Sequence, residues 1–159
     1  MKNLILFALS LSLIAVSCQN KPAEQPPVVH DHAMMMAQAD SVRDGIFVHI
    51  TEGYNDPHRV LMPLKMANMM AMDKDVLVYL DIKAVDLVLK TSRDMEYADF
   101  DPLKTQLQGL IDKKVGVFAC PTCLKLAGHT PEELMVGVQV ANKEAFFNFT
   151  KGRIITLDY

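Results

Sequence analysis

The sequence has no tryptophan and only three cysteines among its 159 residues. Three cysteines are too few for the framework of several disulfides that stabilises many small secreted domains. The formal net charge of -3 excludes the basic surface that nucleic-acid binding requires. Half of the residues are apolar, which is enough for the hydrophobic core of one domain of this length. We therefore expect a domain held by packing, with cysteines that serve chemistry.

The longest apolar run lies at the N-terminus, from Leu4 to Val16. With a lysine before it, this run is typical of a secretory signal and is too short to span a bilayer. The residues Ala15-Val16-Ser17-Cys18 resemble the lipobox of bacterial lipoproteins, which implies cleavage after residue 17 and acylation of Cys18. We therefore predict a signal peptide over residues 1–17 and an exported, membrane-anchored lipoprotein that faces the periplasm or the cell exterior. The alternative is a plain signal peptide or an uncleaved anchor.

Residues 18–43 are rich in proline and polar side chains, without a helical or strand period. We expect a flexible tether here. Its imidazole and thioether groups at His30, His32 and Met34 are candidate metal ligands, because this mixture suits copper in an exported protein. We favour a tether without metal, since an unstructured site has to be ordered by the metal itself. No cofactor is therefore predicted.

Strand-like and helix-like segments alternate over residues 44–159. Short β-branched and aromatic runs predict strands, and capping residues before apolar positions three or four apart predict helices. The expected strands cover residues 45–50, 76–80, 115–119, 136–140 and 153–157. The main expected helices cover residues 57–72, 81–90, 102–111, 121–127 and 142–149. This alternation predicts a three-layer α/β domain with a mainly parallel, five-stranded sheet and helices on both faces, in a flavodoxin-like arrangement.

The first expected helix is rich in methionine, with Met62, Met66, Met69 and Met70 beside its apolar stripe. Methionine fills irregular gaps between packed elements because its side chain is long and unbranched. We expect these side chains to fill the core rather than to bind a metal.

The cysteine pair in Cys120-Pro121-Thr122-Cys123 follows the third expected strand. Proline suits the first position of a helix, so Cys120 is the expected N-cap. The backbone N–H groups and the positive end of a helix stabilise a thiolate, which lowers the pKa of the cysteine. Cys123 follows one turn later, a spacing that in thioredoxin-type proteins lets a dithiol cycle with a disulfide. Sites of parallel sheets lie beyond the carboxyl ends of the strands, where Cys120 is expected.

Three other interpretations concern the same residues. The cysteines are chemically inert if they only pack as small apolar side chains. A zinc site would need further ligands, for which His129, His58 and His49 are the available donors. His58 is also a candidate general base for a thiol, although an exposed histidine at a helix start is an equally good interpretation.

Several short motifs occur in an order that resembles the DsrE/DsrF-like family over residues 44–159. They are the strand Gly45–Ile50, the loop Asp56-Pro57-His58-Arg59, the strand end Leu80-Asp81, the segment from Val117 to Cys123, and the pairs Glu133-Leu134 and Gly137-Val138. The resemblance implies that Cys120 accepts sulfane sulfur as a persulfide and passes it to a partner. It also implies a homo-oligomer, a trimer or hexamer, and a sulfur donor or acceptor that is a protein or a small thiol.

The second cysteine distinguishes this chain from a simple sulfur carrier. A persulfide on Cys120 is open to attack by Cys123, which would release sulfide and leave a disulfide. Export would also place the pair in a compartment where disulfides persist. We therefore predict a sulfur-handling or thiol-redox protein with Cys123 as the resolving thiol. The alternatives are a general thiol–disulfide oxidoreductase and a non-catalytic binding or assembly module, for which a metal is one candidate ligand.

Overall fold

The computed structural model describes residues 42–159. The predictions of a signal peptide, of acylation at Cys18 and of metal ligands at His30, His32 and Met34 lie outside the described residues. Of the expected tether, residues 42 and 43 are described. Arg43 donates a hydrogen bond to the carbonyl oxygen of Lys74 at 2.5 Å, so this side chain contacts the folded domain.

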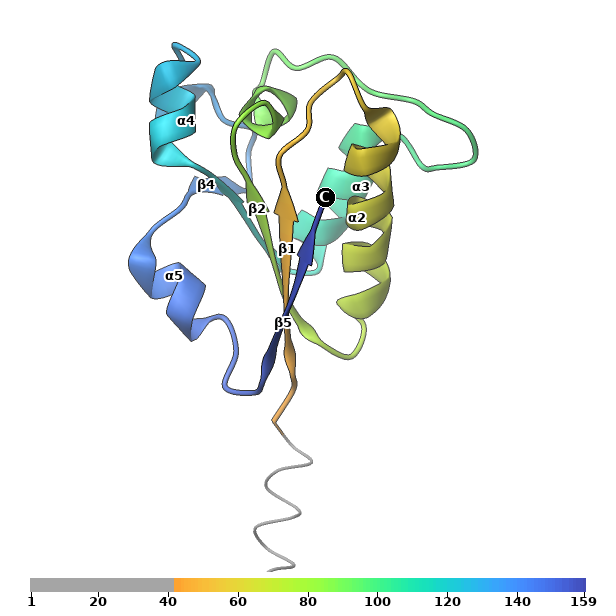
Figure 1. The fold of residues 1–159 in the computed structure, drawn as a ribbon, viewed down its shortest axis with the longest axis vertical. Helices are drawn as coiled ribbons and strands as arrows, with labels where there is room; N and C mark the ends of the chain where they lie inside the picture. Colours follow the sequence, from red (N-terminus) through yellow and green to blue (C-terminus); the bar gives the residue numbers. More distant parts are fainter. Residues whose placement is uncertain (1–41) are drawn as a thin grey trace, which may run out of the picture. The chain divides into compact units, whose positions relative to one another are not determined.

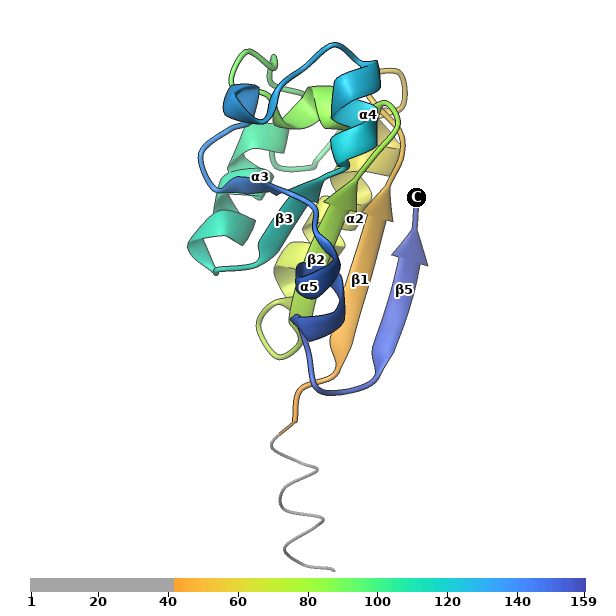
Figure 2. The same cartoon turned by 90° about the vertical axis from the view of Figure 1, so that its left-hand side faces the viewer.

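The centre of the domain is one sheet of five parallel strands in the order β4-β3-β2-β1-β5. The strands are β1 (Gly45–Ile50), β2 (Asp75–Leu80), β3 (Gly116–Ala119), β4 (Val138–Val140) and β5 (Ile154–Asp158). The predicted α/β class and the five-stranded sheet are confirmed, and the sheet is parallel throughout. Figure 2 shows β5 beside β1 at one edge, where the chain ends.

Helices cover both faces of the sheet, as predicted (Figure 1). The α-helices are α2 (Pro57–Met70), α3 (Leu103–Asp112), α4 (Pro121–Leu126) and α5 (Lys143–Asn148), and the 3-10 helices are η1 (Ala84–Val88) and η2 (Pro131–Glu133). The chain steps in one direction from β1 to β3, so right-handed crossovers place α2 and α3 on the same face. From β4 the chain returns across the sheet to β5, on the far side of β1. This reversed direction places α5 on the opposite face. No helix in residues 42–159 combines the length and the apolar character needed to cross a bilayer.

The two faces of the sheet differ in what they bury. Alternate strand residues such as Ile46, Val48 and Val78 point toward α2 and α3 and are almost inaccessible to solvent. The opposite face carries aromatic rings, among them Tyr79, whose centroid lies 5.0 Å from that of Phe146 of α5. Because α5 is short, this second face is only partly covered. It therefore leaves room for polar groups near the ends of the strands.

Capping explains where two of the helices begin. Asp56 accepts a hydrogen bond from the backbone N–H of Arg59 at 3.1 Å, as expected of a cap before proline. Asn142 accepts one from Ala145 at 3.0 Å. The helix expected at residue 102 instead begins at Leu103, because Pro102 has an extended ψ of 149° and takes the cap position itself.

The helix expected over residues 81–90 is wrong in length. The structure has only the 3-10 helix η1 there. Ile82 interrupts the helical backbone with a φ of 48°, in the left-handed region that a β-branched residue rarely adopts. The apolar content of this segment is explained by burial, since four of the five residues of η1 are buried.

The methionines of α2 lie at the edge of the core instead of filling it as expected, and Met70 is the one that packs against the buried cluster. Met69 is 60% exposed, and Met62, Met66 and Met70 are half-buried. The buried row of α2 consists instead of Val60, Leu61, Pro63, Leu64 and Ala67. The methionines flank that row, which is the reason that they reach solvent.

Candidate functional site

Cys120 lies at the carboxyl edge of the sheet, between the end of β3 and the start of α4. Figure 2 shows this junction of β3 and α4. Its backbone N–H donates to the carbonyl oxygen of Leu80 at 2.9 Å, which continues the ladder between β2 and β3 by one residue. Pro121 then occupies the first turn of α4, and Cys120 is the N-cap, as predicted. The sheet and the helix together hold this side chain in place.

The structure brings the two predicted cysteines together. The backbone N–H of Cys123 donates to the sulfur of Cys120 at 3.4 Å. Both are free thiols, and both are half-buried. Leu124, which is 2% exposed, anchors α4 to the core, and Gly128 follows this helix with a φ of 83° that suits glycine.

The two thiols differ in acidity. Burial opposes ionisation of Cys120, but hydrogen bonds from the Tyr79 phenol and from Cys123 hold the pKa of Cys120 below its usual value. Burial raises the pKa of Cys123, and the neighbouring Cys120 sulfur raises it further. Cys120 is therefore the better candidate for a thiolate at neutral pH, and Cys123 for a protonated thiol.

Tyr79 is a site residue that sequence reasoning missed. It pairs with Phe118 across β2 and β3, and strand alternation places the side chains of Phe118 and Cys120 on the same face. Burial raises the pKa of Tyr79, and its hydrogen bond to Cys120 raises it further, so the phenol stays a donor. The signal that could have identified Tyr79 is its hydroxyl group, a polar group within an otherwise apolar strand.

A histidine between two carboxylates extends the site across the sheet. His49 of β1 places Nδ1 2.9 Å from Oδ1 of Asp158 on β5. Its Nε2 lies 3.0 Å from Oδ2 of Asp81, an ion pair that is out of line for a hydrogen bond. The imidazole ring also stacks on Tyr79, with 5.5 Å between the ring centroids. His49 thus connects the last strand to the residues next to the thiols.

The environment of His49 favours its protonated form. Burial lowers the pKa of the imidazole, but the Asp81 and Asp158 carboxylates outweigh burial and raise the pKa above the ordinary value. Asp81 and Asp158 could not be assigned to one site from the sequence, because 77 positions separate them along the chain. Their meeting depends on the strand order, which places β5 beside β1.

The three histidines considered for zinc are not gathered around the cysteines. The ring of His58 is tilted against that of Tyr97, with 5.8 Å between the ring centroids, on the side of the sheet that α2 covers. His129 lies 3.3 Å from a carboxylate oxygen of Asp86, and His49 is held as described above. Within residues 42–159, no three histidine, cysteine or acidic side chains are arranged to hold a metal ion.

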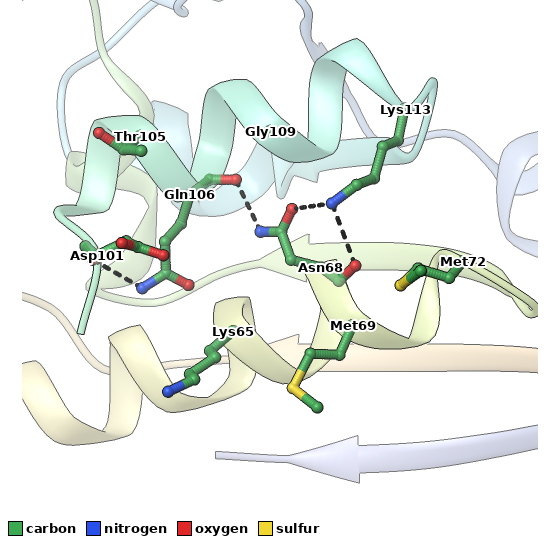
Figure 3. A pocket seen from close by; sticks show the side chains of 9 residues that line it. All are labelled: Lys65, Asn68, Met69, Met72, Asp101, Thr105, Gln106, Gly109 and Lys113. Atoms are coloured by element: carbon green, nitrogen blue, oxygen red, sulfur yellow. Dashed lines mark hydrogen bonds between the residues drawn. The ribbon is translucent and has the colours of Figure 1, made fainter. Parts of the chain in front are cut away.

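A groove between α2 and α3 lies on the other side of the sheet from α5. It has a volume of about 390 Å³. Figure 3 shows that hydrogen bonds between its own walls bridge it. Asn68 donates to the carbonyl oxygen of Gln106 at 2.9 Å, and Lys113 donates to Oδ1 of Asn68 at 2.8 Å. The groove contains no cysteine, so the thiol chemistry belongs to the carboxyl edge of the sheet.

Solved structures with a similar fold include the ychN protein from E. coli, with a TM-score of 0.58 and 18% identity over 72% of this chain and 99% of that one. A protein of unknown function from Methanobacterium thermoautotrophicum, MTH1491, has a TM-score of 0.50, also with 18% identity over 72% of this chain and 99% of that one. At this identity the likeness concerns the fold. No curated protein matches the chain.

The family comparison covers the described domain. The model of the DsrE/DsrF-like family matches residues 44–156. This range includes β1 to β4, the first part of β5 and the cysteine pair. The match spans most of the 159 residues. The chain therefore belongs to the DsrE/DsrF-like family.

Proposed function

We propose that this protein handles sulfur through Cys120, which accepts sulfane sulfur as a persulfide and has Cys123 beside it as a resolving thiol. The observation that carries the proposal is the asymmetric thiol pair. Cys120 accepts the backbone N–H of Cys123 at 3.4 Å, and its pKa is lowered whereas that of Cys123 is raised. Membership in a family associated with sulfur relay supports this assignment.

The loading step is an exchange between sulfur atoms. The Cys120 thiolate attacks the terminal sulfur of a persulfide or polysulfide donor, and a sulfur–sulfur bond forms on Cys120. The sulfur–sulfur bond of the donor breaks, and the remainder of the donor leaves as a thiolate with the electron pair. The lowered pKa of Cys120 increases the fraction of the nucleophilic form at neutral pH. No cofactor takes part, because the cysteine itself carries the sulfur.

A general thiol–disulfide oxidoreductase is the second candidate function. The position of Cys123 one turn from Cys120 favours it, because the pair needs no third cysteine to alternate between dithiol and disulfide. The two functions differ in whether Cys120 holds an additional sulfur atom. A disulfide without sulfur uptake would favour the oxidoreductase.

Intact mass of the full-length chain after exposure to polysulfide tests the proposal. We expect a gain of one sulfur atom that Cys120→Ser abolishes and that lasts longer in Cys123→Ser than in the wild type. The Cys18→Ser variant is the control for sulfur carried by the third cysteine. If no variant gains sulfur, the proposal is wrong.

We also propose an exported lipoprotein that is anchored through acylated Cys18 and assembles as a trimer or hexamer. Its partner would be a sulfur donor or acceptor, either a protein or a small thiol. The anchor rests on the signal-like run before Cys18. Incorporation of a labelled fatty acid by the wild type but not by Cys18→Ala would support acylation, and equal labelling would contradict it.

A further inference from the structure

The Asp81 carboxylate has one oxygen in an ion pair and one that is free. Oδ2 lies 3.0 Å from Nε2 of His49. Oδ1 is buried and has no hydrogen-bond partner among residues 42–159. A buried acceptor without a donor is costly, because it has lost its bonds to water without replacement. This free oxygen therefore needs an explanation in terms of function.

Asp81 follows Leu80 at the end of β2 and lies beside the thiol pair. The carbonyl oxygen of Leu80 accepts the backbone N–H of Cys120 at 2.9 Å, and the Cys120 sulfur accepts that of Cys123 at 3.4 Å. Burial raises the pKa of the Cys123 thiol, and the negative charge of Asp81 raises it further. Ile82 adopts a φ of 48°, a strained conformation for a β-branched residue. This turn directly follows Asp81 at the end of β2, next to the thiol pair.

Cys123 has to lose a proton before it resolves a loaded Cys120, because the thiolate is the nucleophile. The titratable groups that face the thiols or Asp81 come from three strands: His49 from β1, Tyr79 and Asp81 from β2, and Asp158 from β5. Tyr79 and His49 favour their protonated forms. Asp158 uses Oδ1 to accept from His49 at 2.9 Å and is 68% exposed. Asp81 alone among these four offers a buried acceptor atom without a partner.

We propose that Asp81 accepts the proton of Cys123 when Cys123 attacks a Cys120 that carries a sulfur adduct, and that His49 is the positioning residue that holds the carboxylate. This inference rests on the proposed function, which assigns Cys123 as the resolving thiol. In this step the Cys123 thiol is the donor that the free oxygen of Asp81 otherwise lacks.

The step balances with groups that the chain and its adduct provide. The proton of Cys123 moves to Oδ1 of Asp81, directly or through one water. A bond forms between the sulfur atoms of Cys123 and Cys120, while the bond between Cys120 and its adduct breaks. The electron pair leaves with the adduct as a thiolate, or as HS⁻ when the adduct is a persulfide. The two cysteines are oxidised to a disulfide, the leaving sulfur is reduced, and Asp81 then returns the proton to solvent.

The electrostatics of the pair also sets the order of events. While Cys120 is a free thiolate, its charge raises the pKa of Cys123 and keeps that thiol protonated. An adduct on Cys120 removes this charge, so that Cys123 gives up its proton more easily. The resolving thiol is thus activated only after Cys120 has been loaded.

The test uses an aromatic disulfide, 5,5′-dithiobis(2-nitrobenzoate), on the full-length chain with Cys18→Ser. Attack by Cys120 releases one nitrothiobenzoate and leaves the other on the protein, and resolution by Cys123 releases the second. We expect Asp81→Asn to slow the second release on the order of 10²-fold, as for the loss of a general base. The first release should change by less than about threefold, because Asp81 takes no part in that step.

Asp99→Asn is the matched control, because it makes the same change at an exposed carboxylate outside the thiol site. Its second release should stay close to that of the parent protein. An Asp81 that acts only through its charge predicts the opposite result. Its negative charge raises the pKa of Cys123, so its removal would then speed the second release. A second release in Asp81→Asn that is as fast as in the parent, or an equal loss in Asp99→Asn, would overturn the proposal.

Asp81→Ser provides a second variant in case the asparagine protein does not fold. Formate added to it should restore part of the rate of the second release and leave the parent unchanged, because a small carboxylate replaces the missing acceptor. A serine variant that resolves at the parent rate without formate contradicts the proposal. The assay needs no sulfane sulfur, so its outcome is independent of the mass measurement that tests the proposed function.

Discussion

The backbone N–H of Cys123 donates to the sulfur of Cys120, with 3.4 Å between the two atoms. This bond favours the thiolate of Cys120, while burial and the nearby sulfur disfavour the thiolate of Cys123. We expect iodoacetamide at mildly acidic pH to modify Cys120 first, and Cys120→Ser to react more slowly than Cys123→Ser. Peptide mass spectrometry after timed quenching measures both rates. Equal rates in the two variants would contradict this assignment.

Tyr79→Phe removes the phenol that donates to Cys120 and leaves the aromatic ring. A hydrogen bond to a charged group contributes about 1.5–3 kcal/mol, so alkylation of Cys120 at mildly acidic pH should slow by about tenfold. Tyr97→Phe is the control, because Tyr97 is an exposed ring that lies beside His58 and away from the thiols. The pH profile of alkylation is the measurement, and an unchanged profile in Tyr79→Phe would exclude this role.

The ion pair between His49 and Asp158 should make stability depend on pH. Folding raises the pKa of His49 above 6.5, so its stabilising contribution is complete below pH 6.5 and is lost as the pH rises through the folded-state pKa. Asp158 is largely exposed, so we expect Asp158→Asn to cost up to about 1 kcal/mol below pH 6.5 and less at alkaline pH. Urea unfolding at the two pH values measures the difference, with Asp99→Asn as an exposed control. A cost that grows with pH would contradict the expected sign.

Ile82 adopts a left-handed backbone conformation with a φ of 48° while its side chain is 59% exposed. Asparagine tolerates this conformation better than a β-branched residue. We expect Ile82→Asn to raise the free energy of unfolding by up to about 1 kcal/mol. Val136→Asn, at an exposed position with an ordinary backbone, should show no such gain. Chemical denaturation measures both, and a clear loss of stability in Ile82→Asn would show that its apolar side chain matters more than the strain.

The edge strand β5 offers an apolar surface for assembly. Ile154 and Ile155 are 51% and 54% exposed, and β5 pairs with β1 alone among the described strands. Edge strands with apolar side chains readily add further strands. If the proposed oligomer forms through this edge, Ile155→Glu should lower the molar mass measured by light scattering. Gln139→Glu on the opposite edge strand is the charge-matched control, and an unchanged mass in Ile155→Glu would place the interface elsewhere.

Local signals predicted the thiol pair and most of the secondary structure. The strand at Gly45–Ile50, the cap at Asp56 and the cysteine at the end of β3 were all found at the predicted places. Each depends on residues within a few positions of one another, because capping, alternation and proline at a helix start are short-range effects. The segment around Ile82 was predicted wrongly for the same reason: its apolar pattern fits a helix, but that pattern reflects the burial of η1, and the left-handed backbone of Ile82 interrupts the helix.

The amino-acid sequence alone determined the α/β class, the parallel sheet and the place of Cys120 and Cys123 at a strand end and helix start. Only the tertiary structure placed Tyr79 against Cys120, and His49 between Asp81 and Asp158. The physical reason is the strand order, because β5 returns to the far side of β1 and so joins residues that are distant along the chain. Burial on that partly covered face then decides which groups keep their protons and which acceptor stays free.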